Sequence, residues 1–480
     1  MPPRGIPPKA NFEQMRSGAK SFLKAIRSGD VGAVAVAREF HPRFDDLAEF
    51  KLADAQLVVA RSFSFASWPK MKAYFEVADV YGRAPAQTEA STEPVDEFLR
   101  LGCLNYGDDD PARWVQAREM LDSDPKLGRA NLWAAAAAGD LDAARELIDA
   151  DPAAVNREGG PYRWPPLLYL AYSQVARGDA LAVARLLLDH GADPNAGYMW
   201  ENLTPPLTAL TGAFGNGEGE PPPHEAPAGL ARLLLERGAD PNDGQTLYNC
   251  QWARDDYWLE LLFEFGLGAG PVGPWRRRLG EHHQSPKQML EDVLMSACGQ
   301  GYIDRVRLLL AHGVDPAGRE GHHRIYSGRS PAEEAAVSGQ PAIVQLLVEA
   351  GAPDVSALYH FVAAASSGDR NAVGRILRSD PTLRETAIAA HPNEVARASE
   401  RENLDAVALL IELGWDVNAF TRVPALHEAA QLGNLPLIRL LLEHEADPDL
   451  RDHWHKATAA EWAEHHGQAE AERLLRGLDR

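Results

Sequence analysis

One short phrase recurs along this 480-residue chain and constrains the fold more than any other feature. Its two clearest copies are ARLLLDHGADPN at 184–195 and ARLLLERGADPN at 231–242. Weaker copies start at Val306, Val344, Val407 and Ile438. In each copy the apolar residues have helical spacing, and a glycine usually follows the last turn, as in a left-handed helix C-cap. Each copy therefore predicts one helix together with its terminator.

A shorter, alanine-rich segment precedes many of these helices and predicts a second helix in each unit. Examples are LWAAAAAGD from Leu132, FVAAASSGD from Phe361 and ALHEAAQLGN from Ala425. The alanines near the end of these segments recur about every 29 to 33 residues, at Ala336, Ala365, Ala398, Ala430 and Ala463. A period of that length is typical of stacked helix-turn-helix units, whose small side chains let neighbouring units approach closely.

These motifs resemble the ankyrin-repeat family. Its Thr-Pro-Leu-His-x-Ala signature is approached at 423–430, and more loosely at 204–207 and 330–332, while the Gly-Ala-Asp-x-Asn ending occurs at 191–195 and 238–242. The resemblance implies an all-α fold, an ankyrin-repeat α-solenoid of stacked helix-turn-helix units with an α-helical N-terminal cap. It also implies a structural role for His427, which matches the signature histidine and would hydrogen-bond between neighbouring turns.

The repeat pattern predicts four regions along the chain. They are a helical N-terminal cap or degenerate repeat at 1–80, a linker at 81–93, ankyrin repeats at 94–456 with insertions near 213–226 and 265–285, and a C-terminal capping repeat at 457–480. The segments from Phe50 and Phe65 resemble a leader found ahead of the repeats in a group of bacterial ankyrin proteins.

Charge and composition exclude several classes of function. The net charge of -21 repels polyanions, so we expect neither nucleic acid nor a membrane as partner. The three cysteines are scattered, and no apolar stretch has the length of a signal peptide or membrane span, which predicts a soluble, cytoplasmic protein. The motifs of the common nucleotide- and cofactor-binding sites are missing, so we expect no cofactor. We expect no metal site either, because adjacent histidines such as His322 and His323 do not converge on a helix.

Candidate binding residues gather in the middle third, on predicted inner helices and beside the 213–226 insertion. Inner helices face the concave side of such an array, and large aromatic side chains there supply binding energy. The predicted ligand-binding groove comprises Trp133, Trp164, Tyr169, Tyr172, Thr208, Thr211, Phe214, His224, Tyr248, Asn249 and Trp252. The alternative for each tyrosine is a structural role in the core, since tyrosine is commonly half-buried.

The pattern favours a non-catalytic binding or scaffold protein that recognises a protein or peptide through the concave face. The alternative is an atypical enzyme that encloses a small organic substrate in the central groove. His224, Tyr248, Asp255 and His282 would then supply acid-base chemistry. A deep closed pocket beneath 213–226 would favour the enzyme, and an open groove would favour a peptide.

Overall fold

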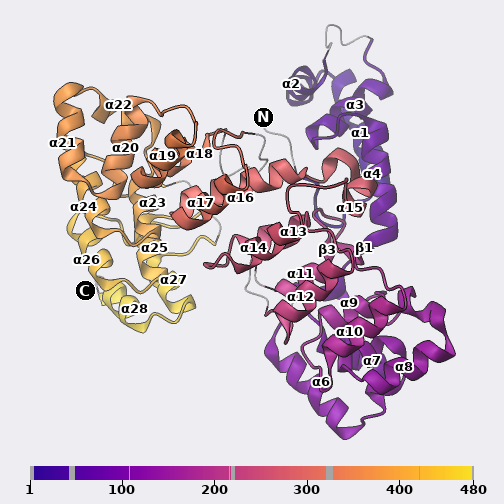
Figure 1. The fold of residues 1–480 in the computed structure, drawn as a ribbon. Helices are drawn as coiled ribbons and strands as arrows, with labels where there is room; N and C mark the ends of the chain where they lie inside the picture. Colours follow the sequence, from indigo (N-terminus) through magenta and orange to yellow (C-terminus); the bar gives the residue numbers. More distant parts are fainter. Residues whose placement is uncertain are drawn as a thin grey trace. The chain divides into compact units, whose positions relative to one another are not determined.

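The computed structural model describes residues 5–42, 49–107, 109–215, 217, 222–319, 328–420, 422–453 and 455–477. Part of the predicted 213–226 loop and the whole His322-His323 pair lie outside these ranges. The chain divides into two compact units, Met1–Met289 and Leu290–Arg480, which are described separately here (Figure 1).

Unit 1 is built from helices, with one small sheet among its described residues. Its elements are α1 (Phe12–Arg27), α2 (Val31–Phe40), α3 (Leu52–Ser62), α4 (Trp68–Tyr81), β1 (Gly82–Arg83), η1 (Pro85–Gln87), α5 (Pro94–Gly102), α6 (Pro111–Ser123), η2 (Leu127–Arg129), α7 (Leu132–Ala138), α8 (Leu141–Ala150), η3 (Pro152–Asn156), α9 (Pro166–Ala171), α10 (Ala180–Asp189), β2 (Gly197–Trp200), β3 (Leu207–Thr208), α11 (Ala209–Phe214), α12 (Pro227–Glu236), α13 (Gly244–Cys250), α14 (Tyr257–Glu264), α15 (Pro274–Leu279) and η4 (Gly280–His282).

Helix α16 (Pro286–Gln300) spans the boundary in the sequence, and the described elements of unit 2 that follow it are all helical. They are α17 (Ile303–Ala311), α18 (Pro331–Val337), α19 (Pro341–Glu349), α20 (Ala357–Ser367), α21 (Arg370–Ser379), α22 (Leu383–Ala390), α23 (Glu394–Glu400), α24 (Leu404–Leu413), α25 (Ala425–Gln431), α26 (Leu435–Glu443), α27 (Ala459–His465) and α28 (Ala469–Arg476). The prediction of a helical solenoid is confirmed. No helix in the described ranges has the length and apolar character needed to cross a membrane.

The six copies of the repeated phrase all fall in helices, α10, α12, α17, α19, α24 and α26. Their terminating glycines adopt the predicted left-handed conformation, with φ of 86° at Gly191 and 94° at Gly238. The copy in α26 has Glu445 at this position, and it takes the same conformation with φ 64° despite its side chain. The capping geometry is therefore kept even where glycine is lost, although a non-glycine residue is disfavoured there.

The asparagine that ends the phrase links one turn to the next. The Asn195 amide nitrogen donates to the carbonyl oxygen of Gly238 over 2.9 Å, and its side-chain oxygen accepts from the amide of Asp240 over 2.8 Å. Asn156, Asn242 and Asn418 make the same two-bond link to the following turn, at distances of 2.7 to 3.3 Å. Each asparagine thereby pairs two backbone groups of its neighbour and fixes the spacing of the stack.

The N-terminal helices pack on the second predicted insertion. In α4, the ring of Tyr81 lies 5.0 Å from that of Trp275 in α15, and the Arg278 guanidinium lies within about 5 Å of both rings. The His282 ring stacks on Phe65 at 4.0 Å. The insertion near 265–285 therefore contains α15 and η4 and forms an aromatic contact surface for residues far away in sequence.

A three-stranded sheet, which the sequence analysis did not predict, lies beside this contact. Strand β1 runs parallel to β2, with Gly82 opposite Met199, and β2 runs antiparallel to β3, with Gly197 opposite Thr208. The segment predicted as a linker thus contributes β1 to the sheet. Its Arg83 is buried and pairs with Glu158 at 2.7 Å, which fixes the chain after α4.

We predict that Asn195→Ala lowers the free energy of unfolding of unit 1 by about 1–2 kcal/mol, because two backbone groups lose their partner. Hydrogen exchange at the Asp240 amide should accelerate in this variant, and mass spectrometry of the exchanged peptides measures it. Asn393→Ala is the control, since that side chain makes no capping hydrogen bond. Unchanged exchange at Asp240 would contradict the role given to Asn195.

Candidate binding surface

Three aromatic side chains at the turn between α13 and α14 reach the surface of unit 1. Trp252 is 53% exposed and Tyr257 is 44% exposed, while Tyr248 is half-buried. The rings of Tyr248 and Trp252 meet edge to face with centroids 6.1 Å apart. These three residues are called the exposed aromatic patch. An exposed tryptophan that packs on a tyrosine, with a second exposed tyrosine five residues along the chain, is a feature of interaction sites rather than of an average surface.

Neighbouring residues anchor the patch to the interior. Asn249, next to Tyr248 in α13, is buried, and its amide donates to the carbonyl of Gly215 over 2.8 Å. Trp258 follows Tyr257 in α14, and its ring lies 5.0 Å from Tyr257 and 4.2 Å from Phe214. Because the residues beside the patch are held in this way, its rings lie on a firmly packed base, and a rigid base lowers the entropy cost of binding.

The other residues of the predicted groove lie mostly in the interior. Eight of the eleven are buried, namely Trp164, Tyr169, Tyr172, Thr208, Thr211, Phe214, His224 and Asn249. Trp133 is half-buried and donates its indole N–H to the carbonyl of Arg157 over 2.9 Å. Of the predicted set, Trp252 and part of Tyr248 and Trp133 are therefore available to a large partner.

The buried aromatic residues form one cluster around Trp164. Its ring lies 4.7 Å from Tyr162, 4.9 Å from Tyr198 and 5.4 Å from both Tyr169 and Tyr172. With Tyr106, whose ring is 5.9 Å from that of Tyr172, these residues are called the tyrosine cluster. The structure thus brings Trp164, Tyr169 and Tyr172 together, but inside the unit.

Two threonines and one aspartate connect the tyrosine cluster to the next repeat of the stack. The Tyr172 hydroxyl donates to the carbonyl of Thr208 over 2.8 Å, and the Thr208 hydroxyl donates to Asp243 over 2.6 Å. Asp243 also accepts from the Thr246 amide at 2.9 Å and so caps α13. Sequence reasoning missed Asp243, Tyr106, Tyr162 and Tyr198. Asp243 directly follows the repeated phrase and precedes a helix, and this N-cap signal could have identified it from the sequence.

The residues of the enzymatic alternative have different surroundings. His282 packs on Phe65 and Tyr74, whereas the Nδ1 atom of His224 accepts from the Ala226 amide at 3.1 Å. Burial lowers the pKa of each of these two histidines to about 4, so both are neutral at pH 7. Asp255 is exposed and accepts from the Tyr257 amide at 3.1 Å. Within the described ranges, no group of three or more metal-ligating side chains is arranged to hold an ion.

In unit 2, charged side chains connect alternate inner helices. Glu334 of α18 is buried and pairs with Arg397 of α23 at 3.1 Å and with Arg329 at 2.7 Å. On α25, burial and, to a smaller extent, the negative charge of the nearby Glu400 together raise the pKa of Glu428 to about 7. The inner helices therefore carry both a satisfied ion-pair network and a carboxyl group that titrates near neutrality.

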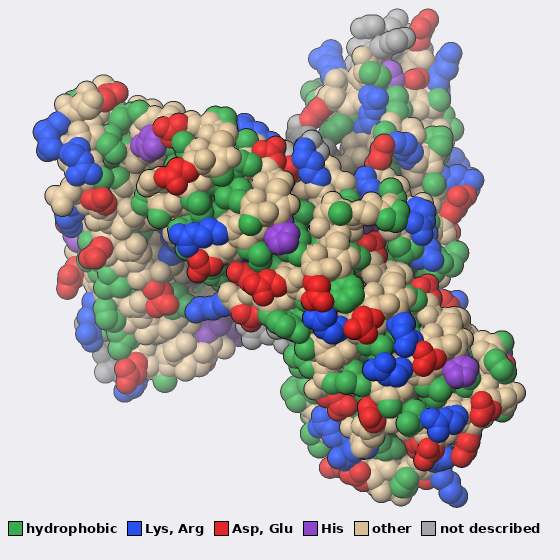
Figure 2. Space-filling view, in the orientation of Figure 1, with side chains coloured by type: hydrophobic (Ala, Val, Ile, Leu, Met, Phe, Trp, Pro, Cys, Tyr) green, Lys and Arg blue, Asp and Glu red, His purple; other side chains and the backbone are tan. Residues whose placement is uncertain are grey.

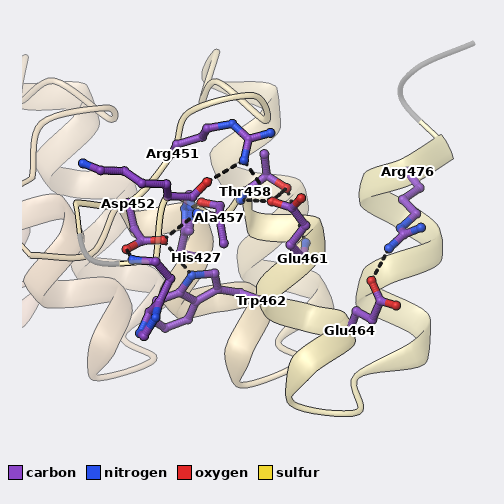
Figure 3. Close-up of polar contacts among 11 residues, drawn as sticks. His427, Arg451, Asp452, Ala457, Thr458, Glu461, Trp462, Glu464 and Arg476 are labelled. Atoms are coloured by element: carbon purple, nitrogen blue, oxygen red, sulfur yellow. Dashed lines mark hydrogen bonds and ion pairs between the residues drawn. The ribbon is translucent and has the colours of Figure 1, made fainter.

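The last helix pairs show how polar groups hold the stack together (Figure 3). His427 in α25 makes a 2.9 Å hydrogen bond with the carbonyl of Ala457 in the following turn. Buried Asp452 accepts from the Ala457 amide at 3.0 Å and from the Trp462 indole at 3.1 Å. A capping box between Thr458 and Glu461 begins α27. The His427 bond between neighbouring repeats is the role that the resemblance implied for the signature histidine.

A comparison with protein families now accounts for this pattern. Residues 361–477 match a family model described as ankyrin repeats, in three copies. The chain carries ankyrin repeats. A search of curated proteins gave no match.

On the face shown in Figure 2, acidic and basic side chains are interspersed over both units. A single basic field of the kind that binds nucleic acid is not seen on that face.

We predict that His282 makes stability pH-dependent between about pH 6.5 and pH 4. Its pKa is lowered in the folded chain, so the unfolded chain binds protons more readily, and stability falls as the pH drops through this window. His282→Phe keeps the ring stack and removes the titration. The loss on going from pH 6.5 to pH 4 should then be smaller than in the parent by about 1–2 kcal/mol.

Urea unfolding followed across this pH range measures the difference between the two chains. The exposed His465, changed to Gln, is the control and should leave the pH dependence of the parent intact. Parallel pH profiles for the parent and His282→Phe would contradict the prediction.

Proposed function

We propose that this chain is a non-catalytic binding protein that recognises a protein or peptide segment through the exposed aromatic patch. Ankyrin repeats are generally protein-interaction modules, and the match at 361–477 supports a binding scaffold. The observation that carries the proposal is the exposure of Trp252, whose ring packs on the half-buried Tyr248, and of Tyr257 at the start of α14. Burying such rings against a partner gives a large contact area for little loss of side-chain entropy.

The charge of the chain favours a basic partner segment. Arg254, Asp255 and Asp256 lie between Trp252 and Tyr257 in the sequence, which leaves this turn with an excess of negative charge, and the whole chain has a net charge of -21. Long-range attraction would accelerate the approach of a segment rich in lysine or arginine, and would disfavour an acidic one. The aromatic rings would then accept the apolar or cationic side chains of that segment.

The proposed setting is a reducing compartment, in a cytoplasmic protein of bacterial type. Cys103, Cys250 and Cys298 are buried thiols, as suits such a compartment. The four-region organisation, with a cap at 1–80, a linker at 81–93, repeats at 94–456 and a final capping repeat at 457–480, belongs to the same proposal. In this organisation, the exposed aromatic patch would lie on the central repeats.

A peptide selection tests the proposed function. Peptides displayed on phage are selected against the full chain, and the affinities of those recovered are measured for the parent, Trp252→Ala and Tyr248→Ala. We expect Trp252→Ala to weaken binding by about thirtyfold or more, as loss of a hot-spot tryptophan costs about 2 kcal/mol. Recovered peptides should be enriched in lysine and arginine.

Two exposed apolar residues outside the patch serve as controls. Val31 in α2 and Leu432 after α25 are 83% and 39% exposed, and their change to alanine should leave the affinities within about twofold. If peptides bind with the same affinity to Trp252→Ala and Tyr248→Ala as to the parent, the patch is not the recognition surface.

A further inference from the structure

The first part of the chain has the opposite charge to the rest. Residues 1–83 contain 13 lysines and arginines against 9 aspartates and glutamates, whereas residues 84–480 contain 35 against 60. Six of the nine lysines of the whole chain lie within the first 72 residues. The net charge of -21 conceals this asymmetry, which indicates that the N-terminal helices meet a different kind of partner from the rest of the chain.

Four exposed cations of α1 share one side of the helix and are called the basic stripe. They are Arg16, Lys20, Lys24 and Arg27. Their spacing of four, four and three residues places them within an arc of about 80°, because a helix turns once in about 3.6 residues. The buried residues of α1 lie on another side of the helix, which packs on α3. The basic stripe therefore faces away from the core of the unit.

The basic stripe has few partners in its own chain. Its first member pairs with Glu13 at 2.9 Å, but the side chains of the other three make no hydrogen bond or ion pair with the residues that the structure describes. The helix dipole accounts for the two cations in the last turn of α1, but not for Lys20 in its middle. Other exposed arginines of unit 1 do pair with carboxylates, at 2.6 to 3.0 Å, and examples are Arg129, Arg157 and Arg177.

The surface beside the basic stripe is open. Ser17, Gly18 and Ser21 are exposed, and a Cβ atom added to Gly18 would meet nothing within 4 Å. Glycine inside a helix costs about 1 kcal/mol relative to alanine, and no packing among the described residues compensates for it here. Small side chains allow a second helix to pack with its axis about 8–10 Å away. This side of α1 therefore has room for a helix of another molecule.

We propose that the basic stripe docks an acidic α-helix of a partner protein. Cations four residues apart on α1 are about 6 Å apart along the helix axis, and carboxylates four residues apart on a facing helix have the same spacing. Opposite charges in two such rows also set the register and direction of a helix pair. This docking is separate from peptide recognition by the exposed aromatic patch, because it uses another helix and a partner of opposite charge.

Other anionic partners fit α1 less well. A nucleic acid duplex carries a charge about every 1.7 Å, so its phosphates beyond the basic stripe would be repelled by the acidic remainder of the chain. The aromatic residues of α1, Phe12 and Phe22, are half-buried in the cores of the unit and offer no ring for a base to stack on. The apolar side of α1 is also packed inside, so it is not free to enter a bilayer.

Fluorescence anisotropy with a labelled probe tests the docking on the full chain at about 50 mM salt. The probe is an alanine-based helical peptide of sixteen residues with a glutamate at every fourth position, and its control has glutamine at those positions. We expect a dissociation constant of about 0.1 mM for the glutamate peptide, weakened severalfold at about 200 mM salt, and no binding of the glutamine peptide. Labelled oligothymidine and vesicles of phosphatidylserine and phosphatidylcholine in equal parts represent the other anionic partners.

Two variants test the basic stripe itself. Lys20→Gln/Lys24→Gln keeps good helix formers and should weaken binding about tenfold through the loss of two ion pairs. Lys126→Gln/Lys456→Gln removes the same charge from exposed lysines elsewhere and should bind as the parent does. Gly18→Leu raises the helix propensity of α1 but fills the open surface, so it should weaken binding without lowering the unfolding temperature.

Three results would overturn the proposal. The first is the absence of glutamate-peptide binding up to about 1 mM protein, which leaves the basic stripe as a solvated face. The second is equal binding of that peptide by the parent and by Lys20→Gln/Lys24→Gln, which places the contact elsewhere. The third is binding of oligothymidine or of the vesicles without binding of the glutamate peptide, which assigns the basic stripe to another class of partner.

Discussion

The repeats of this chain depend on one paired hydrogen bond, the side-chain amide of an asparagine spanning two backbone groups of the next turn. At Asn195 it ties the turn of α10 to that of α12, and at Asn418 it ties the turn of α24 to that of α26. An amide carries both a donor and an acceptor, so it can satisfy an N–H and a C=O at once. The hydrophobic faces of the helices hold the stack together, but these amides set its step.

The helical architecture could be predicted because its causes are local. Periodic leucines define the outer helices, and alanine runs such as 134–138 define inner helices that pack closely. Whether an individual tyrosine is buried or exposed could not be predicted in this way. Tyr169 and Tyr248 each lie on an inner helix of unit 1, yet Tyr169 is enclosed by Cys103 and by residues from 159–164. Whether a ring is covered depends on segments that approach from elsewhere in the chain, and a periodic pattern does not show them.

Only part of the candidate site could be predicted, because the burial of its side chains also depends on segments from elsewhere in the chain. The aromatic density at 248–258 indicated a surface that the structure retains at Trp252, because few groups pack over that turn. The tyrosine cluster is assembled from separate segments, so its chemistry, including the roles of Asp243 and Tyr198, follows from the fold alone. The small sheet was not predicted, because strands of two to four residues have too few positions to show an alternating pattern.

The contact between the N-terminal helices and α15 also bears on how the chain is made. Repeat arrays gain structure progressively, since each unit needs only its neighbour. Here, Phe65, just before α4, and Lys70 in α4 contact His282 and Glu281, which are joined to the chain more than two hundred residues later. The face of α4 that packs on α15 and η4 therefore remains uncovered for much of synthesis on the ribosome. A nascent chain that stalls before α15 exposes this face to chaperones and to other nascent chains.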